Sequence, residues 1–135
     1  MKTNLFCICM VPALAVAAFA QGSTFLKADV PFDFSAGNSM MSAGRYQVER
    51  GPANGTVTIR SDDGKKAAIV MTLPTTSVAR HEKGSLMFHR YGNAYILSEI
   101  WTPGNNGRQL STTKRERELA RGLTAPTSET LAAVR

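Results

Sequence analysis

The sequence predicts an all-β domain: an antiparallel β-sandwich or small barrel of about seven strands, with a short C-terminal helix. Two observations predict it. Short segments with alternating apolar and polar side chains recur along the chain, and this alternation indicates strands with one buried face. Turn signals rich in glycine, asparagine and aspartate separate these segments at short intervals, as is typical of sandwiches and barrels.

The first part of the chain has the pattern of a secretory signal peptide. Residues 1–20 combine the positive charge of Lys2, an uncharged apolar stretch over residues 5–17 and small residues at the end. Cleavage is expected between Ala20 and Gln21, which places the protein in the periplasm or outside the cell. The apolar stretch is short for a bilayer span, which needs about 20 residues, so no transmembrane segment is expected after cleavage.

Both cysteines of the chain, Cys7 and Cys9, lie inside this leader. Neither has the position that a lipoprotein signal requires, so lipidation is not expected. The exported chain therefore carries no cysteine, which excludes disulfides, cysteine nucleophiles and thiolate metal sites. A chain of 135 residues that is 43% hydrophobic has to be stabilised by an apolar core instead.

The sequence pattern predicts four strands in the first half of the domain. Apolar and polar residues alternate strictly over residues 26–34, and Pro31 marks this strand as an edge strand or as bent. Shorter alternating segments over residues 45–50 and 56–60 follow, separated by a dense turn signal. An Asp-Asp-Gly turn leads into residues 67–73, a nearly continuous apolar run that indicates a strand covered on both faces.

The sequence pattern predicts fewer strands in the second half of the domain. Residues 74–84 form the longest polar interruption. A strand is expected over residues 85–89, and the last strand over residues 94–101, with a tight Gly-Asn turn between them. Residues 103–107, a Pro-Gly-Asn-Asn-Gly segment, are expected to form a loop.

A short helix is expected over residues 114–121. Thr112 or Thr113 can cap its start, and Gly122 can end it. The rest of the chain, residues 123–135, is expected to be loose.

Charge supports a division of the chain into three parts. We expect a signal peptide over residues 1–20, a β domain over residues 21–110 and a basic helical and flexible tail over residues 111–135. Residues 102–135 hold six basic and three acidic side chains, so this end carries much of the net charge of +6.

Several segments together are similar to those of a known family. They are VPFDF at 30–34, AGRYQV at 43–48, FHRYG at 88–92, YILSEIW at 95–101 and ERELAR at 116–121. In this set the chain resembles a family of small secreted bacterial proteins of unknown function. Where the family has Leu-Pro before Ala-Gly, this chain has Met41-Ser42. The resemblance implies a secreted all-β domain and implies no particular activity.

No catalytic or metal-binding motif is written in the sequence. The candidate metal ligands are His81, Glu82, His89 and Glu99, but the chain has two histidines and neither an HxH nor an HExxH pattern. No G-x-S-x-G nucleophile elbow occurs. We therefore expect no metal, no cofactor and no catalytic residue.

One cluster is the best candidate for recognition of a ligand. It consists of His89, Arg90, Tyr91, Tyr95 and Trp101, which lie on two strands that a tight turn connects. An arginine over an aromatic ring can hold an anionic or carbohydrate ligand. The alternative is a cation–π pair that only braces the hairpin.

These observations favour a secreted or periplasmic, non-enzymatic domain that binds or assembles at the cell envelope. Its partner is expected to be an envelope polysaccharide or another envelope protein, and not a specific nucleic acid. The rival is a small extracytoplasmic hydrolase or sugar-modifying enzyme, which needs His89 or Glu99 in a hollow with a second polar group. A third hypothesis is a ligand-carrying barrel whose apolar cavity is lined by Phe32, Phe34, Val70 and Phe88.

Overall fold

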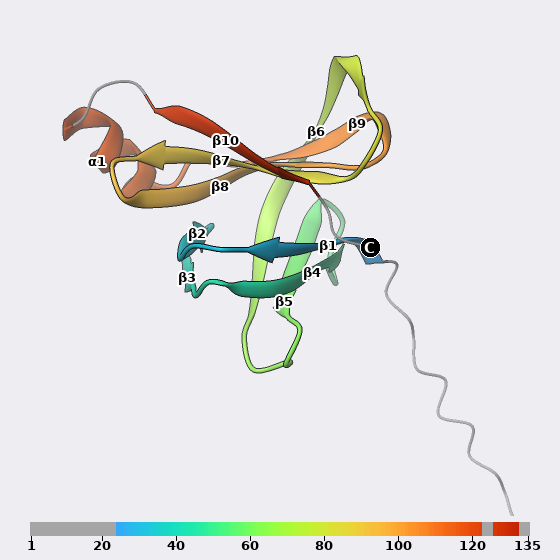
Figure 1. The fold of residues 1–135 in the computed structure, drawn as a ribbon, viewed down its shortest axis with the longest axis horizontal. Helices are drawn as coiled ribbons and strands as arrows, with labels where there is room; N and C mark the ends of the chain where they lie inside the picture. Colours follow the sequence, from blue (N-terminus) through green and yellow to red (C-terminus); the bar gives the residue numbers. More distant parts are fainter. Residues whose placement is uncertain (1–23, 123–125, 133–135) are drawn as a thin grey trace, which may run out of the picture.

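Figure 1 shows a β-sandwich whose two layers of strands lie one above the other. The computed structural model describes residues 24–122 and 126–132, which form ten strands and one helix. The expected leader and its cleavage site at Ala20 and Gln21 lie outside these residues. No helix within the described ranges is long and apolar enough to cross a membrane.

The elements follow one another along the chain with short connections. In chain order they are β1 (Thr24–Val30), β2 (Phe34–Ala36), β3 (Ser39–Met41), β4 (Gly44–Arg50), β5 (Thr56–Ser61), β6 (Ala67–His81), β7 (Ser85–Tyr91), β8 (Ala94–Trp101), β9 (Gly104–Leu110), α1 (Lys114–Gly122) and β10 (Thr127–Ala132). The predicted all-β class with a short helix near the C-terminus is confirmed.

Strand β6 belongs to both layers. Its first part pairs with β5, and from Thr72 onward it pairs with β9, so a single strand of 15 residues joins the two layers. One layer runs β1-β4-β5-β6, and the other continues from β6 through β9 and β8 to β7 and β10. The hairpin of β2 and β3 joins this second layer through a parallel pairing of β2 with β8, which makes the sheet mixed.

The core lies between the layers and is closely packed. The ring of Phe34 lies 5.4 Å from that of Phe88 and 5.2 Å from that of Tyr46, both in edge-to-face arrangements. Phe34, Val70 and Phe88 are buried, and Phe32 packs against them. The side chains that were expected to line an apolar cavity thus pack against one another in the core.

The first predicted strand is divided in two. Leu26, Ala28 and Val30 are buried as the alternation predicts, but β1 ends at Val30 and the chain bends before β2 begins. The bend expected at Pro31 is confirmed, because proline has no N–H to donate to a ladder.

The prediction of a strand covered on both faces at residues 67–73 is wrong. Ala68 and Val70 are buried, whereas Ile69, Met71 and Leu73 are 61%, 67% and 65% exposed. Only one face of β6 meets the opposite layer, so alternate side chains of this apolar run face outward.

The expected polar interruption at residues 74–84 is mostly strand. Strand β6 continues through it to His81, because β9 supplies ladder partners from Thr72 to Thr76 and again at His81. Pro74 is accommodated opposite Arg108 of β9.

The C-terminal part of the chain holds more structure than its composition predicted. Strand β8 has the predicted bounds, but it is not the last strand, since the segment expected as a loop at residues 103–107 lies largely within β9. Helix α1 forms as predicted, and the hydroxyl of Thr113 accepts the backbone N–H of Glu116 at 3.2 Å. The expectation of a loose end is wrong for residues 127–132, because β10 pairs with β7 along its whole length.

Gly107 lies against the indole ring of Trp101, and this contact yields a stability test. A Cβ atom at position 107 would lie 2.5 Å from ring atom Cε3. We expect Gly107→Ala to lower the free energy of unfolding by about 1–3 kcal/mol, because overpacking forces the ring or the strand to move. Gly122→Ala is the control, since a Cβ there meets nothing within 4 Å. Urea denaturation measures both, and a G107A midpoint equal to that of wild type would contradict the packing.

Candidate functional site

The hairpin of β7 and β8 carries all five residues of the predicted recognition cluster but does not bring them into one site. Arg90 pairs with Tyr95, and Tyr91 pairs with Ala94. Because side chains alternate along a strand, His89 and Tyr91 lie on the opposite face of β7 from Arg90. Trp101 lies at the other end of the hairpin, where it pairs with Ser85.

Arg90 and Tyr95 form the structural pair that was the alternative to a ligand site. The guanidinium carbon of Arg90 lies 5.4 Å from the ring centroid of Tyr95, whose ring also stacks on Phe32 at 3.7 Å. The same guanidinium donates to the carbonyl of Gly92 at 2.8 Å and to Glu129 of β10 at 3.2 Å. Its donors therefore brace the hairpin and hold the last strand.

His89 and Tyr91 share one buried carboxylate from helix α1. Atom Oε1 of Glu116 lies 2.8 Å from Nδ1 of His89 and accepts the hydroxyl of Tyr91 at 3.1 Å. Glu116 is 7% exposed, so these two partners compensate for its loss of water. The carboxylate thereby anchors α1 to the outer face of β7.

Sequence reasoning did not include Glu116 among the site residues, although a signal for its position exists. Thr113 and Glu116 have the spacing of a capping box, in which the acidic side chain usually turns back to the start of its own helix. Here the threonine half of the box forms, while the glutamate reaches the sheet instead.

Trp101 is buried and has two polar neighbours, His81 and Glu99. Its ring stacks on His81 with 4.4 Å between centroids, and Nε1 donates to Glu99 at 2.8 Å. Trp101 is 5% exposed. It therefore offers little open aromatic surface to a sugar ring.

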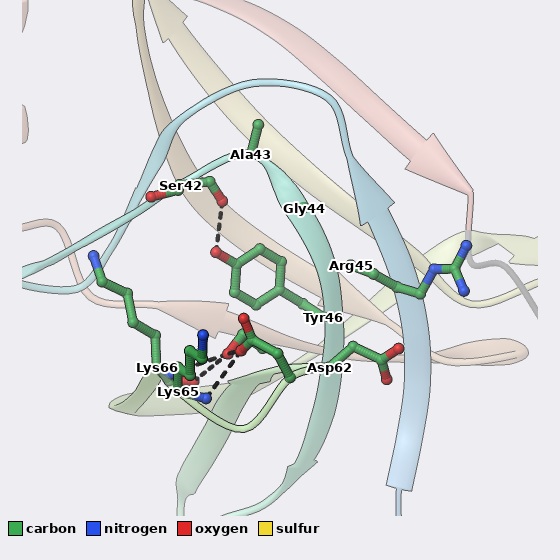
Figure 2. Close-up of a pocket in the computed structure, with 10 residues that line it drawn as sticks. Ser42, Ala43, Gly44, Arg45, Tyr46, Asp62, Lys65 and Lys66 are labelled. Carbon is green, nitrogen blue, oxygen red and sulfur yellow. Dashed lines mark hydrogen bonds between the residues drawn. The ribbon is translucent and has the colours of Figure 1, made fainter.

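One hollow lined by described residues lies beside the turn between β5 and β6 (Figure 2). It measures about 660 Å³ and mixes the cations of Arg45, Lys65 and Lys66 with two aspartates. The hydroxyl of Tyr46 donates to the carbonyl of Ser42 at 2.5 Å, which closes one wall.

The two aspartates of this first hollow form hydrogen bonds with residues in or beside the turn between β5 and β6. Asp63 accepts the hydroxyl of Ser61 at 2.6 Å and the backbone N–H of Lys65 at 2.9 Å. These hydrogen bonds, that of Ser61 foremost, lower the pKa of the Asp63 carboxyl. Asp62 accepts the side-chain amide of Gln47 at 3.0 Å. The polar groups of the hollow thus stabilise the turn more than they offer sites to a ligand.

Two further hollows adjoin each other, and together we call them the arginine cleft. They measure about 390 and 300 Å³ and share Arg50, Pro74 and Arg108. The larger adds Thr75, Thr76, Ile100, Thr102, Asn106 and Gly107, and the smaller adds Asn54, Gly55 and Thr56.

The arginine cleft opens where the interior of the sandwich ends. Arg50 is the last residue of β4 and pairs with Val57, a core residue. Arg108 pairs with Ile100, also a core residue. Because directly paired residues face the same side of a sheet, both arginines extend from the core-facing side of their strands. One comes from each layer, and they meet in the lining of the cleft.

Arg108 is oriented by a chain of hydrogen bonds. Its Nη1 donates to the hydroxyl of Thr72 at 3.4 Å, and that hydroxyl donates to the carbonyl of Gly55 at 2.8 Å. The backbone N–H of Thr72 donates to the same carbonyl at 2.8 Å. The loop before β5 and the middle of β6 are thus joined by hydrogen bonds beside the guanidinium.

The arginine cleft is electrostatically one-sided. Its lining contains two guanidinium groups and no aspartate or glutamate. Among the described residues no ion pair involves Arg50 or Arg108. An arginine without a carboxylate partner favours an anion.

A stripe of apolar side chains lies on the outer face of β6. Ile69, Met71 and Leu73 are all more than half exposed, and they follow one another on one face of the strand. Their cross-strand neighbours on β5 are Thr58 and Thr56. Exposed apolar patches are common at interaction surfaces.

Three of the candidate metal ligands have other neighbours, since His81 stacks on Trp101, His89 contacts Glu116 and Glu99 accepts the indole N–H of Trp101. In residues 24–122 and 126–132, no three side chains of the kinds that hold metal ions gather in one place.

Comparisons with known proteins add no family to this description. No family model matches the chain, and neither the curated proteins nor the solved structures include a match. The class of the protein therefore rests on its fold, a β-sandwich, and on the geometry of its sites.

The anchor of helix α1 yields a pH-dependent prediction. Burial raises the pKa of Tyr91 above the ordinary value of 10.0, and Glu116 raises it further. Tyr91 therefore contributes stability that is complete below pH 10.0 and is lost as the pH rises through its folded pKa. We expect Tyr91→Phe to lower the free energy of unfolding by about 1 kcal/mol at neutral pH and to lessen its alkaline decline.

Urea denaturation of wild type and Y91F from neutral pH to about pH 11 tests this expectation. Burial also raises the pKa of Tyr46, with added contributions from Asp63 and Asp33. Some alkaline loss should therefore persist in Y91F. Parallel stability curves for the two proteins above pH 10.0 would rule out a linked Tyr91.

Proposed function

We propose that the protein is an exported, non-catalytic β-sandwich domain that binds a component of the cell envelope in the arginine cleft. The observation that carries the proposal is the cleft itself: two guanidinium groups from different layers line one hollow, which contains no acidic side chain. Concave sites at the open end of a β structure are common ligand sites. The signal-peptide pattern of residues 1–20 supports export.

Binding is favoured over catalysis because the side chains that could act in catalysis form hydrogen bonds within the fold. His89 and Tyr91 contact the carboxylate of Glu116, and Glu99 accepts the indole N–H of Trp101. The rival hydrolase needs His89 or Glu99 in a hollow, and neither lines any of the three hollows described above.

An envelope polysaccharide is the partner that best fits the proposal. The cleft offers arginines together with threonine and asparagine side chains, which match anionic groups and hydroxyl groups. Envelope polymers carry both kinds of group, and an exported protein meets them directly. The resemblance of this chain to small secreted bacterial proteins agrees with such a location.

The export part of the proposal predicts a defined N-terminus. When the whole chain is expressed in bacteria, we expect the protein outside the cytoplasm to begin at Gln21. Mass spectrometry of the purified protein measures this directly. Replacement of Ala18 and Ala20 by arginine should block the cut, since signal peptidase needs small residues there. A mature protein that still begins at Met1 would rule out the cleavage.

The binding part predicts a loss with two substitutions in the cleft. Protein exported from cells that express the whole chain is applied to an array of purified envelope polysaccharides. We expect the double variant R50Q/R108Q to bind at least tenfold more weakly than wild type, because each charged hydrogen bond contributes about 1.5–3 kcal/mol.

Arg60→Gln is the matched control. Arg60 is exposed on β5, pairs with Gln47 and Ala67, and lines none of the three hollows, so the substitution removes one charge away from the cleft. Binding of R60Q should stay close to that of wild type. Equal binding by the double variant and wild type would overturn the proposed site, and release of shortened polymer would favour the hydrolase.

A further inference from the structure

We infer that the arginine cleft recognises an acidic oligosaccharide, with a sugar carboxylate held by Arg50 and Arg108 and neighbouring hydroxyls held by the threonine and asparagine side chains. This inference rests on the proposed function and names the ligand class of the same site. It follows from the charge of the cleft, its shape and the kinds of side chain that line it.

The charge of the cleft selects an anion. Both arginines have planar donor groups that match the two oxygens of a carboxylate. Arg108 donates to Thr72 at 3.4 Å, and Thr72 in turn bonds to Gly55, so this contact favours one orientation of the guanidinium before a ligand arrives. Such preorganisation lowers the entropy that binding costs.

The polar lining selects a sugar next to that anion. Thr75, Thr76, Thr102 and Asn106 line the larger hollow, and Asn54 and Thr56 line the smaller. The hydroxyls of Thr102 and Thr56 already donate to the carbonyls of Asn106 and Ala53, so these two groups offer a ligand only acceptor positions. Hydroxyl and amide groups both donate and accept hydrogen bonds, as sugar hydroxyls do. A small inorganic anion would leave most of these groups without a ligand partner.

The shape of the cleft suits a chain of sugars. The two hollows, of about 390 and 300 Å³, share the arginines, so ligand can extend to either side of the charged centre. Each volume lies at the lower end of the range for small-molecule sites, about 300–1,000 Å³. An oligosaccharide with its carboxylate at the centre would use both.

The cleft does not suit single-stranded nucleic acid, the other common polyanion. Proteins that bind single strands stack the bases on aromatic side chains. No phenylalanine, tyrosine or tryptophan is among the residues that line the two hollows. The donors could meet a phosphate, but the bases would find no stacking surface.

The decisive experiment compares an acidic oligosaccharide with its neutral form. Oligogalacturonate, the same oligosaccharide with its carboxyls methyl-esterified, and inorganic sulfate are titrated calorimetrically into the exported protein. We expect oligogalacturonate to bind at least tenfold more tightly than the ester or sulfate, since the ester loses the charged hydrogen bonds and sulfate loses the sugar contacts.

Variants tie the binding to the cleft. R50Q and R108Q should each weaken the binding of oligogalacturonate about tenfold, while R60Q should change it less than twofold. Arg50 and Arg60 are exposed and Arg108 is half-buried, so all three variants should fold. Amide proton NMR spectra check the fold and show whether the resonances that shift belong to the cleft.

The outcomes separate this inference from the proposed function. Equal affinity for the acid and the ester, with a loss of both in R50Q/R108Q, would overturn the anionic ligand but keep the cleft as a binding site. Sulfate bound as tightly as oligogalacturonate would overturn the sugar contacts. Polysaccharide binding on the array that R50Q/R108Q leaves unchanged would overturn the proposed function and this inference together.

Discussion

The whole structure depends on the backbone ladder of β6. This strand pairs with β5 in its first part and with β9 afterwards, so its hydrogen bonds join the two layers. Each layer then packs its apolar side chains against the other, with Phe34, Val48 and Phe88 fully buried between them. Only the first part of this strand contributes to the interior, since Ala68, Val70 and Thr72 are buried and no residue after Thr72 is. Its outer face remains open to solvent, as the exposed Ile69 and Met71 show.

The arginine cleft is a consequence of this arrangement. Beyond its pairing with β5, strand β6 continues as a ladder with β9, and Arg50 is the last residue of β4. At this end of the sandwich, strand positions on the core-facing side line an open hollow instead of the apolar core. Arg50 and Arg108 occupy such positions, and Thr72 links Arg108 to the loop before β5. The interior of the sandwich thus changes from apolar to cationic at this end.

The C-terminal part of the chain completes the second layer. Glu116 connects α1 to His89 and Tyr91, and β10 covers the edge of β7 that β8 leaves free. Covering an edge strand matters because unpaired backbone groups invite association with other chains. The FHRYG and ERELAR segments, which are far apart in the sequence, meet at Glu116. The side chains of His89, Tyr91 and Glu116 in these segments therefore attach the helix to the sheet.

Local patterns predicted much of the fold. The alternation of Tyr46 with Val48 correctly indicated a strand with one buried face. Val57 and Ile59 are buried as predicted, but Thr56 and Thr58 on the other face of β5 are buried as well. The bounds of β8 and the start of α1 were also predicted, since turns and helix caps depend on neighbouring residues. In contrast, β9 and β10 lack apolar alternation, and they form strands because existing strands offer them hydrogen-bond partners.

The sequence by itself determined the all-β class, the position of most strands and the capped helix, because period-two alternation, turn residues and caps are local properties. Only the tertiary structure decided that Ile69, Met71 and Leu73 face solvent. A continuous apolar run is compatible with a strand that is buried on one face and with a strand that is buried on both. It also decided that Arg50 and Arg108 share a cleft. Residues on separate strands become neighbours through non-local pairing, which no short pattern in the chain encodes.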